Sequence, residues 1–159
     1  MMGNNVEPAK SLVEAACAAG VTLGCAESCT GGLVAGAITD VPGSSAVFKG
    51  GVVAYWPEAK SAVLGVPPAL IERCGVVSEE VAAAMAKGAR ELFSCDVAVA
   101  TTGIAGPGGG QPGCPVGTVC FGLADADGTR ACTTMRGGAR DEVRELAVRH
   151  ALELLMEAV

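Results

Sequence analysis

The run Asp96–Thr101 restricts the fold of this chain more than any other feature. After the initial Asp it consists of Val and Ala up to Thr101, with no alternation of apolar and polar side chains. Strands of this kind are typically covered by helices on both faces. Although 50% of the 159 residues are hydrophobic, only 3% are aromatic and 23 are glycine, so Ala, Val and Leu must form a closely packed core. We predict a single-domain α/β fold, a three-layer α/β/α sandwich around a mixed, largely parallel β-sheet.

Helical periodicity, short apolar runs and turn signals predict the other elements. In the segment 78–93, Val81, Met85 and Leu92 are expected to form one apolar stripe. Residues 1–7 are expected to form a loose tail. Helices are predicted over 8–19, 32–39, from Pro57 to before Pro67, 69–74, 78–93 and 140–156, and strands over 21–25, 50–55 (buried), 96–101, 116–124 and 129–135.

Charge and cysteine usage exclude several classes of function. The net charge of −6 and the pI near 4.7 argue against a nucleic-acid partner, which requires clustered Lys and Arg. The eight cysteines include no Cys-x-x-Cys pair, and several lie in apolar segments, so we expect reduced thiols and no metal site. The sequence shows no signal peptide and no apolar run long enough for a membrane span. A soluble, cytoplasmic protein with no membrane partner is expected.

The stretch 26–32 has the pattern of a strand end, a tight turn and a helix start. Such a turn can aim one hydroxyl outward, while the first N–H groups of the helix point toward an anion or oxyanion. Ser28 is therefore a candidate nucleophile. The alternative is that Ser28 or Thr30 only caps the helix, which is a common role of these residues. The stretch by itself does not decide between the two.

A nucleophilic Ser28 would need a base. The single histidine, His150, lies late in the last predicted helix beside its apolar stripe, which argues against a Ser-His-Asp triad. Lys60 is a candidate because burial can lower an ammonium pKa, and the hydroxyl of Tyr55 could orient or relay the proton. From spacing alone, the favoured interpretation is that Lys60 is a solvated helix residue and Tyr55 a packed aromatic. Cys29 is a rival nucleophile, but neighbouring side chains rarely face the same way.

The glycine-rich segment 102–110 follows a predicted strand, where open α/β sheets bind ligands. It matches neither a P-loop nor a dinucleotide fingerprint, because Gln111 replaces the last glycine of the latter. The segment is compatible with a ligand-binding loop and with a structural turn. Arg140, at the start of the last helix, could bind a phosphate or belong to a surface charge cluster.

Several blocks together resemble the CinA C-terminal domain family, the nicotinamide mononucleotide amidohydrolases, over nearly the whole chain. They are Ala-Glu-Ser-Cys-Thr-Gly-Gly at 26–32, Gly-Ser-Ser-Ala-Val-Phe at 43–48, Gly-Gly-Val-Val-Ala-Tyr at 50–55 with Lys60 beyond it, Gly-Val-Val-Ser-Glu at 75–79, Thr-Gly-Ile-Ala-Gly-Pro at 102–107 and Pro-Val-Gly-Thr-Val at 115–119.

The resemblance implies hydrolysis of the nicotinamide mononucleotide carboxamide to nicotinate mononucleotide and ammonia in pyridine nucleotide recycling, with no metal or redox cofactor. The nucleophilic serine of the family matches Ser28, and its lysine and tyrosine partners match Lys60 and Tyr55. N–H groups near 30–32 are implied for the oxyanion, and the glycine loop and arginine for ribose and phosphate. The implied substrate-binding residues are Thr30, Gly31, Gly32, Thr102, Gly103, Ala105, Gly106 and Arg140.

The chain departs from the family pattern beside two of these residues. Trp56-Pro57 follows Tyr55 where the family usually has Ser-Asn, and Ala139 precedes Arg140 where it usually has Asp. These departures keep two other hypotheses open, a nucleotide-sensing or partner-binding domain without turnover and an amidase acting on another small carboxamide. The chain resembles the stand-alone form of the family, for which a homodimer is expected.

Overall fold

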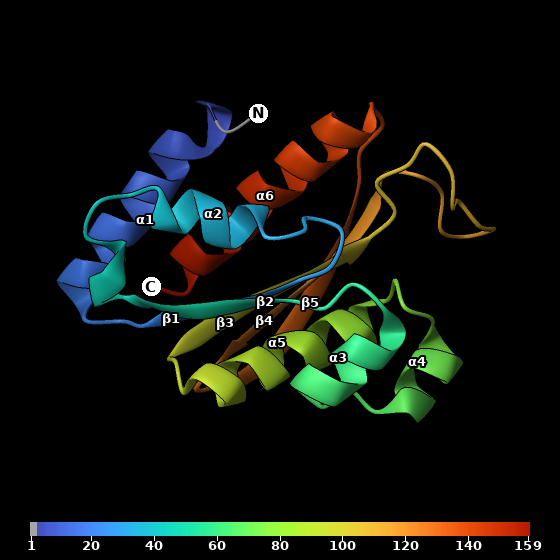
Figure 1. The fold of residues 1–159 in the computed structure, drawn as a ribbon, viewed down its shortest axis with the longest axis horizontal. Helices are drawn as coiled ribbons and strands as arrows, with labels where there is room; N and C mark the ends of the chain where they lie inside the picture. The colour runs from blue at the N-terminus through green and yellow to red at the C-terminus, as the bar shows by residue number, and fades with distance from the viewer. Residues whose placement is uncertain (1–2) are drawn as a thin grey trace.

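The computed structural model describes residues 3–159, which form one mixed five-stranded sheet (Figure 1). The strand order is β2-β1-β3-β4-β5. β1 pairs in parallel with β2 and β3, whereas β4 pairs antiparallel with β3 and β5. The strands span Phe48–Val53 (β2), Leu23–Glu27 (β1), Val97–Gly103 (β3), Thr118–Asp125 (β4) and Gly128–Met135 (β5).

Helices cover both faces of the sheet, which confirms the three-layer α/β/α prediction (Figure 1). One face carries α1, α2 and α6, and the opposite face carries α3, α4 and α5. Each layer has its own apolar core against the sheet. The helices span Val6–Ala19 (α1), Leu33–Thr39 (α2), Pro57–Leu64 (α3), Pro68–Cys74 (α4), Glu79–Phe93 (α5) and Arg140–Glu157 (α6), with short 3-10 helices at Gly3–Asn5 and Ser44–Ala46.

Small residues let α5 pack closely against the sheet and against α3. A Cβ at Gly122 of β4 would clash with the carbonyl oxygen of Ala82 in α5, and a Cβ at Gly88 of α5 would clash with the carbonyl oxygen of Leu64 in α3. This packing explains an error in the predicted stripe of α5. Val81 and Met85 are buried, but Leu92 is 49% exposed, because alanines and Gly88 occupy most of the buried face instead.

Two strand boundaries differ from the prediction in ways that matter for the site. β1 begins and ends two residues later than predicted, so Glu27 is its last residue and the turn starts at Ser28. β3 continues to Gly103 and takes in the start of the predicted glycine loop. The segment 50–55 was predicted to be a buried strand, but β2 is an edge strand whose residues are alternately half-buried and exposed.

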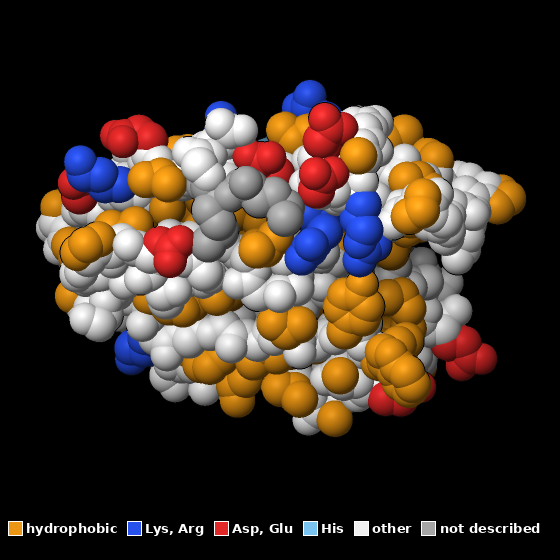
Figure 2. Space-filling view, turned by 45° about the horizontal axis from the view of Figure 1, so that its top comes forward, with side chains coloured by type: hydrophobic (Ala, Val, Ile, Leu, Met, Phe, Trp, Pro, Cys, Tyr) orange, Lys and Arg blue, Asp and Glu red, His pale blue; other side chains and the backbone are white. Residues whose placement is uncertain are grey.

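The predicted loose tail is not observed in the part of it that the structure describes. Gly3–Asn5 forms a 3-10 helix, Val6 starts α1, and Asn5 is 4% exposed, with its side-chain amide donating to the carbonyl of Glu145 in α6. Residues 1–2 lie outside the described residues. Within 3–159, no helix is long and apolar enough to cross a membrane. On the face shown in Figure 2, Lys and Arg side chains form no continuous stripe.

Candidate active site

Ser28 and Lys60, which are far apart in the sequence, meet at the carboxyl end of β1. Ser28 is the first residue after β1, and Lys60 lies in α3 on the face opposite α6. Lys60 Nζ lies 2.9 Å from Ser28 Oγ in hydrogen-bonding geometry. Ser28 is 7% exposed and Lys60 fully buried. The two side chains that the sequence offered as a nucleophile and its base are thus in direct contact.

Burial is the main influence on the Lys60 ammonium group. Desolvation lowers the pKa of Lys60 from 10.5 to about 8, and a nearby cysteine, Cys29, opposes this only in part. Nζ also lies 2.8 Å from the carbonyl oxygen of Ala54 and 3.2 Å from that of Tyr55. An ammonium would donate to these two carbonyls and to Ser28. In a neutral amine, the two carbonyls accept the two N–H hydrogens, and the lone pair is left for the Ser28 hydroxyl proton.

The start of α2 is capped by Glu27 rather than by Ser28 or Thr30. The Glu27 carboxylate is 1% exposed and accepts hydrogen bonds from the N–H groups of Gly32, Val34 and Ala35 at 2.9–3.0 Å. It also accepts one from the Thr30 hydroxyl at 2.6 Å. The capping alternative for Ser28 is therefore wrong. Because its N–H already donates to Glu27, Gly32 is also not a donor that could bind an oxyanion in this arrangement.

Two further residues hold the turn in place. Thr101 of β3 accepts the Ser28 N–H through its carbonyl at 3.0 Å, and its hydroxyl lies 2.8 Å from that of Thr30. Arg144 of α6 donates from Nε to the carbonyl of Cys29 at 3.0 Å and from Nη2 to that of Thr30 at 3.2 Å. The sequence reasoning missed Glu27, Thr101 and Arg144. Only Glu27 carried a local signal, as an acidic residue just before a helix start.

Tyr55 and Arg140 form a second pair beside the first. Arg140 Nη2 donates to the Tyr55 hydroxyl at 3.2 Å, and Nη1 donates to the carbonyl of Gly106 at 2.8 Å. Tyr55 is 53% exposed, and only its backbone carbonyl contacts Lys60. The side chains of Ser28 and Lys60 are thus joined directly, whereas the Tyr55 side chain is joined to Arg140 and the glycine loop.

The predicted substrate residues of the glycine segment are packed against their own chain. A Cβ at Gly103 would lie 2.8 Å from the carbonyl oxygen of Thr118, and one at Gly106 would lie 2.6 Å from Val116 Cγ1. The Thr102 hydroxyl donates to the carbonyl of Val76 at 2.9 Å, and Ala105 is 5% exposed. These contacts give the segment a structural role, while Gly31 remains exposed and Gly32 half-buried at the turn.

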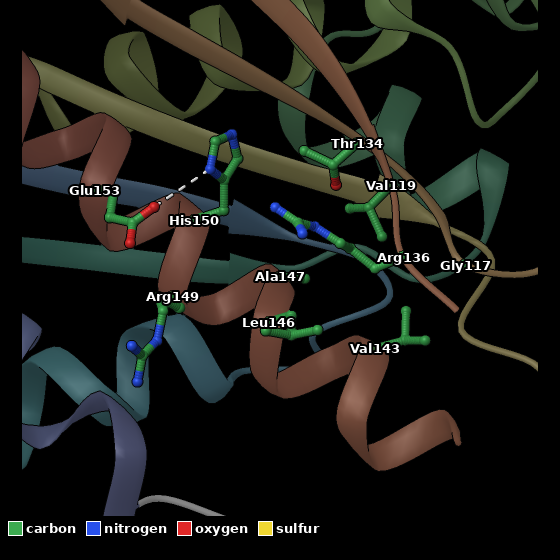
Figure 3. Close-up of a pocket in the computed structure, with 10 residues that line it drawn as sticks. All are labelled: Gly117, Val119, Thr134, Arg136, Val143, Leu146, Ala147, Arg149, His150 and Glu153. Carbon is green, nitrogen blue, oxygen red and sulfur yellow. Dashed lines mark ion pairs between the residues drawn. The ribbon is translucent and has the colours of Figure 1, made fainter. Parts of the chain in front are cut away.

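The rival catalytic residues are placed elsewhere. Cys29 packs in the core between the sheet and α1, α2 and α6, and burial raises its pKa to about 11. His150 lies beside a cavity of about 110 Å³ between α6 and strands β4 and β5, and its ring is paired with Glu153 (Figure 3). The His150 ring also lies 3.6 Å from the thiol of Cys132. Neither Ser28 nor Lys60 lines this cavity. The structure therefore excludes a triad through His150 in this arrangement.

The described part of the chain contains neither a cluster of metal-ligating side chains nor a disulfide. Residues 3–159 contain no group of three or more His, Cys, Asp or Glu side chains arranged to hold a metal ion. All eight cysteines are unpaired thiols, as expected from the sequence. The chemistry that the side chains present is that of a hydroxyl against a buried amine.

Comparisons of the sequence and of the structure with known proteins point to the same family. The profile described as the CinA C-terminal domain matches residues 5–159. A CinA-like protein from Mycolicibacterium gilvum is 54% identical over 146 residues, which is 91% of this chain but 35% of that protein. The chain thus spans about a third of the length of the curated relatives it matches.

Two solved structures are similar over almost their full length. The competence/damage inducible protein from Agrobacterium tumefaciens has a TM-score of 0.94 at 41% identity, covering 98% of this chain and 95% of that one. A competence-damaged protein (CinA) superfamily member from Escherichia coli has a TM-score of 0.93 at 35% identity, covering 98% and 90%.

Proposed function

Because the chain belongs to the CinA C-terminal domain family, we propose that it is a hydrolase that converts nicotinamide mononucleotide to nicotinate mononucleotide and ammonia, in pyridine nucleotide recycling. The observation that carries the proposal is the 2.9 Å contact between Ser28 Oγ and the buried Nζ of Lys60. A hydroxyl held against an amine with a pKa near 8 suits amide cleavage by a serine nucleophile. The choice of substrate rests on the family resemblance.

In this proposal Lys60 acts as the base in its neutral form. Its two N–H hydrogens donate to the carbonyls of Ala54 and Tyr55, and its lone pair accepts the Ser28 hydroxyl proton as Oγ attacks the carboxamide carbon. The C–N bond of the tetrahedral intermediate then breaks, and the proton on Lys60 passes to the leaving nitrogen, which departs as ammonia. Water attacks the acyl ester and gives its proton to Lys60. The C–Oγ bond then breaks, and Lys60 returns the proton to Ser28 Oγ, which restores the hydroxyl and the neutral amine and releases the carboxylic acid product.

Tyr55 and Arg140 are proposed to contact the substrate at the edge of this pair. The Tyr55 hydroxyl is half-exposed and hydrogen-bonded to Arg140, so both groups are available to an entering ligand. The Arg140 guanidinium uses one donor on Gly106 and one on Tyr55, and its remaining N–H groups can bind a phosphate. We also propose that the wall of the substrate site around these groups is formed by Thr30, Gly31, Gly32, Thr102, Gly103, Ala105 and Gly106.

Ammonia release tests the proposal directly. Purified protein is expected to release ammonia from nicotinamide mononucleotide, and Ser28→Ala is expected to release none above background. Ser45→Ala provides the control, because Ser45 is exposed and lies in the short 3-10 helix. Full activity of Ser28→Ala would contradict the serine mechanism even if the substrate is correct.

One observation favours a second candidate, an amidase acting on another small carboxamide. Trp56 is 72% exposed and directly follows Tyr55, and Ala139 directly precedes Arg140, so both departures from the family pattern flank the proposed substrate contacts. A panel of small carboxamides with ammonia as the readout separates the candidates.

Calorimetry with nicotinamide mononucleotide tests the third hypothesis, a nucleotide-sensing domain without turnover, for which tight binding without ammonia release is expected.

The resemblance also supports a cytoplasmic homodimer. Sedimentation of the purified chain is expected to give twice the monomer mass, and a monomer at micromolar concentration would contradict this assembly.

A further inference from the structure

Arg144 makes an uncommon contact with the turn that carries the nucleophile. From α6 its guanidinium donates to two successive backbone carbonyls, those of Cys29 and Thr30, at 3.0 and 3.2 Å. The side chain is half-buried and forms no ion pair with a carboxylate within residues 3–159. Its charge is therefore directed at the peptide groups that follow Ser28.

The orientation of those peptides follows from planarity. The Cys29–Thr30 peptide is trans, so the Thr30 N–H points opposite to the Cys29 carbonyl that Arg144 binds. It therefore points away from α6. Lys60 reaches Ser28 from α3, in the layer on the opposite side of the sheet from α6 (Figure 1). The contact with Arg144 thus turns the Thr30 N–H away from the α6 layer and toward the side from which Lys60 approaches.

The hydrogen bonds of the turn show which donors remain available. The Gly31 N–H donates to the carbonyl of Ser28, and the Gly32 N–H donates to Glu27. The N–H groups of Cys29 and Thr30 donate to no other residue within 3–159. Among the described residues, the Thr30 N–H is thus a free backbone donor close to the nucleophile, as is used to stabilise an oxyanion in acyl transfer.

We infer that Arg144 is a positioning residue that holds the N–H group of Thr30 in place to stabilise the oxyanion formed when Ser28 attacks a carbonyl. The inference rests on the proposed serine hydrolase and extends it to a residue that touches neither Ser28 Oγ nor Lys60. By accepting two charged donors, the Cys29 and Thr30 carbonyls fix and polarise the Cys29–Thr30 and Thr30–Gly31 peptide groups. Of the two N–H groups in these peptides, that of Gly31 already donates to the carbonyl of Ser28, so the Thr30 N–H is the one left for an oxyanion. The residue acts through the backbone, so its removal affects the transition state more than substrate binding.

The test uses a probe that does not depend on the identity of the substrate. An alkyl fluorophosphonate reacts when Ser28 Oγ bonds to phosphorus, fluoride leaves and Lys60 accepts the hydroxyl proton, and its phosphoryl oxygen takes the oxyanion position. Labelling rates at Ser28 are measured by mass spectrometry for the wild type, Arg144→Lys and Arg144→Gln. Arg149→Lys is the matched control, because Arg149 also lies on α6 and donates to a backbone carbonyl, that of Asn4.

The expected result is labelling slowed by about tenfold or more in both Arg144 variants and by less than about twofold in Arg149→Lys. With nicotinamide mononucleotide, kcat per folded molecule should fall by a similar factor while KM stays within about twofold, as expected when an interaction made only in the transition state is lost. Each variant is compared below its own thermal midpoint, and Arg144→Gln decides the question if Arg144→Lys does not fold.

Three other outcomes are distinguishable. Wild-type labelling rates in the folded Arg144 variants would overturn the inference and leave the serine mechanism standing. A wild type that is labelled at Ser28 but releases no ammonia would overturn the proposed substrate, and the labelling comparison would still decide the role of Arg144. A wild type that is not labelled at Ser28 would overturn both the nucleophile and the inference.

Discussion

At the scale of the residue, Lys60 is the most unusual group in the molecule. It is fully buried, and within residues 3–159 its Nζ is hydrogen-bonded only to Ser28 Oγ and two backbone carbonyls, with no carboxylate partner. Burial without a counter-charge is costly for an ammonium and favours the neutral amine. The same fact that makes Lys60 a suitable base therefore also makes it a destabilising element of the fold at neutral pH.

The pH dependence of activity should report the Lys60 pKa. Because the neutral amine is the active form, kcat/KM is expected to rise about tenfold per pH unit below about pH 8 and to level off above it. Tyr55→Phe should keep the same midpoint, since the Tyr55 hydroxyl contacts Arg140 rather than Ser28. A midpoint that moves in Tyr55→Phe would instead make Tyr55 part of the proton transfer.

Stability should depend on pH in the window set by the same group. The folded-state pKa of Lys60, about 8, lies below the ordinary value of 10.5, so between these values the unfolded chain binds more protons. The free energy of unfolding should therefore rise with pH in this window, by at most about 1.4 kcal/mol per unit. Below about pH 8 Lys60 is protonated in both the folded and the unfolded state, so it no longer makes the free energy of unfolding depend on pH.

Comparing chemical denaturation of the wild type and Lys60→Met isolates this contribution. The stability of the wild type relative to the variant is expected to increase from about pH 8 to about pH 10 and to stay constant below about pH 7. A difference that does not change with pH would contradict the lowered pKa.

At the scale of the element, the buried Glu27 carboxylate joins the end of β1 to the start of α2. It accepts hydrogen bonds from the N–H groups of Val34 and Ala35 in α2, from the N–H of the N-cap residue Gly32 and from the Thr30 hydroxyl. These bonds replace the side-chain cap that Gly32 lacks. Since α2 has only 7 residues, it has few internal hydrogen bonds of its own and depends on this cap. Glu27 thus sets the path of the turn that carries Ser28.

Glu27→Gln is expected to lower the free energy of unfolding by about 2–3 kcal/mol, because one side of the amide would present N–H groups to backbone donors. The thermal midpoint should fall by about 4–12 °C. Glu91→Gln, an exposed position on α5, serves as the control and should change the midpoint little. Equal stability of Glu27→Gln and wild type would show that the cap is not needed.

The start of α6 offers the opposite case, a helix whose cap is incomplete. The N-cap residue Ala139 has no side-chain acceptor, although the Glu142 carboxylate already accepts its N–H at 2.8 Å. Ala139→Ser would complete a capping box and is expected to stabilise the protein by about 1 kcal/mol, raising the midpoint by about 2–4 °C. Ala139→Val has no acceptor and should give no gain. The prediction fails if the Ser variant does not exceed the Val variant.

At the scale of the whole molecule, the close approach of α5 to the sheet sets the thickness of one layer. Gly122→Ala places a methyl group against the Ala82 carbonyl in this interface and is expected to destabilise the protein by about 1–3 kcal/mol or more. Gly137→Ala is the control, because a Cβ there meets nothing within 4 Å and needs no positive φ. Equal denaturation curves for the two variants would show that α5 and the sheet can move apart without a loss in the free energy of unfolding.

The sequence by itself determined the class of fold and the type of the six helices and five strands. Apolar runs without alternation, helical periodicity and glycine or proline punctuation are local properties, and they predicted the three layers. The roles of Ser28 and Lys60 followed from the family resemblance, because the local patterns also fitted a helix cap and a solvated lysine. The errors concern where strands end and which side chains of a helix are buried. β1 and β3 each run on two residues past their predicted ends, and Leu92 is exposed, because strand pairing and the small-residue contact of α5 involve distant segments.

The tertiary structure decided what those residues can do. Lys60 is 32 positions from Ser28, and Arg144 is 115 positions from Cys29, so neither contact follows from spacing in the chain. The low pKa of Lys60 arises from burial by segments that the fold brings over α3, and the capping role of Glu27 depends on where β1 ends. The chemistry of Ser28 is therefore set by desolvation and hydrogen bonds, which exist only once the layers are assembled.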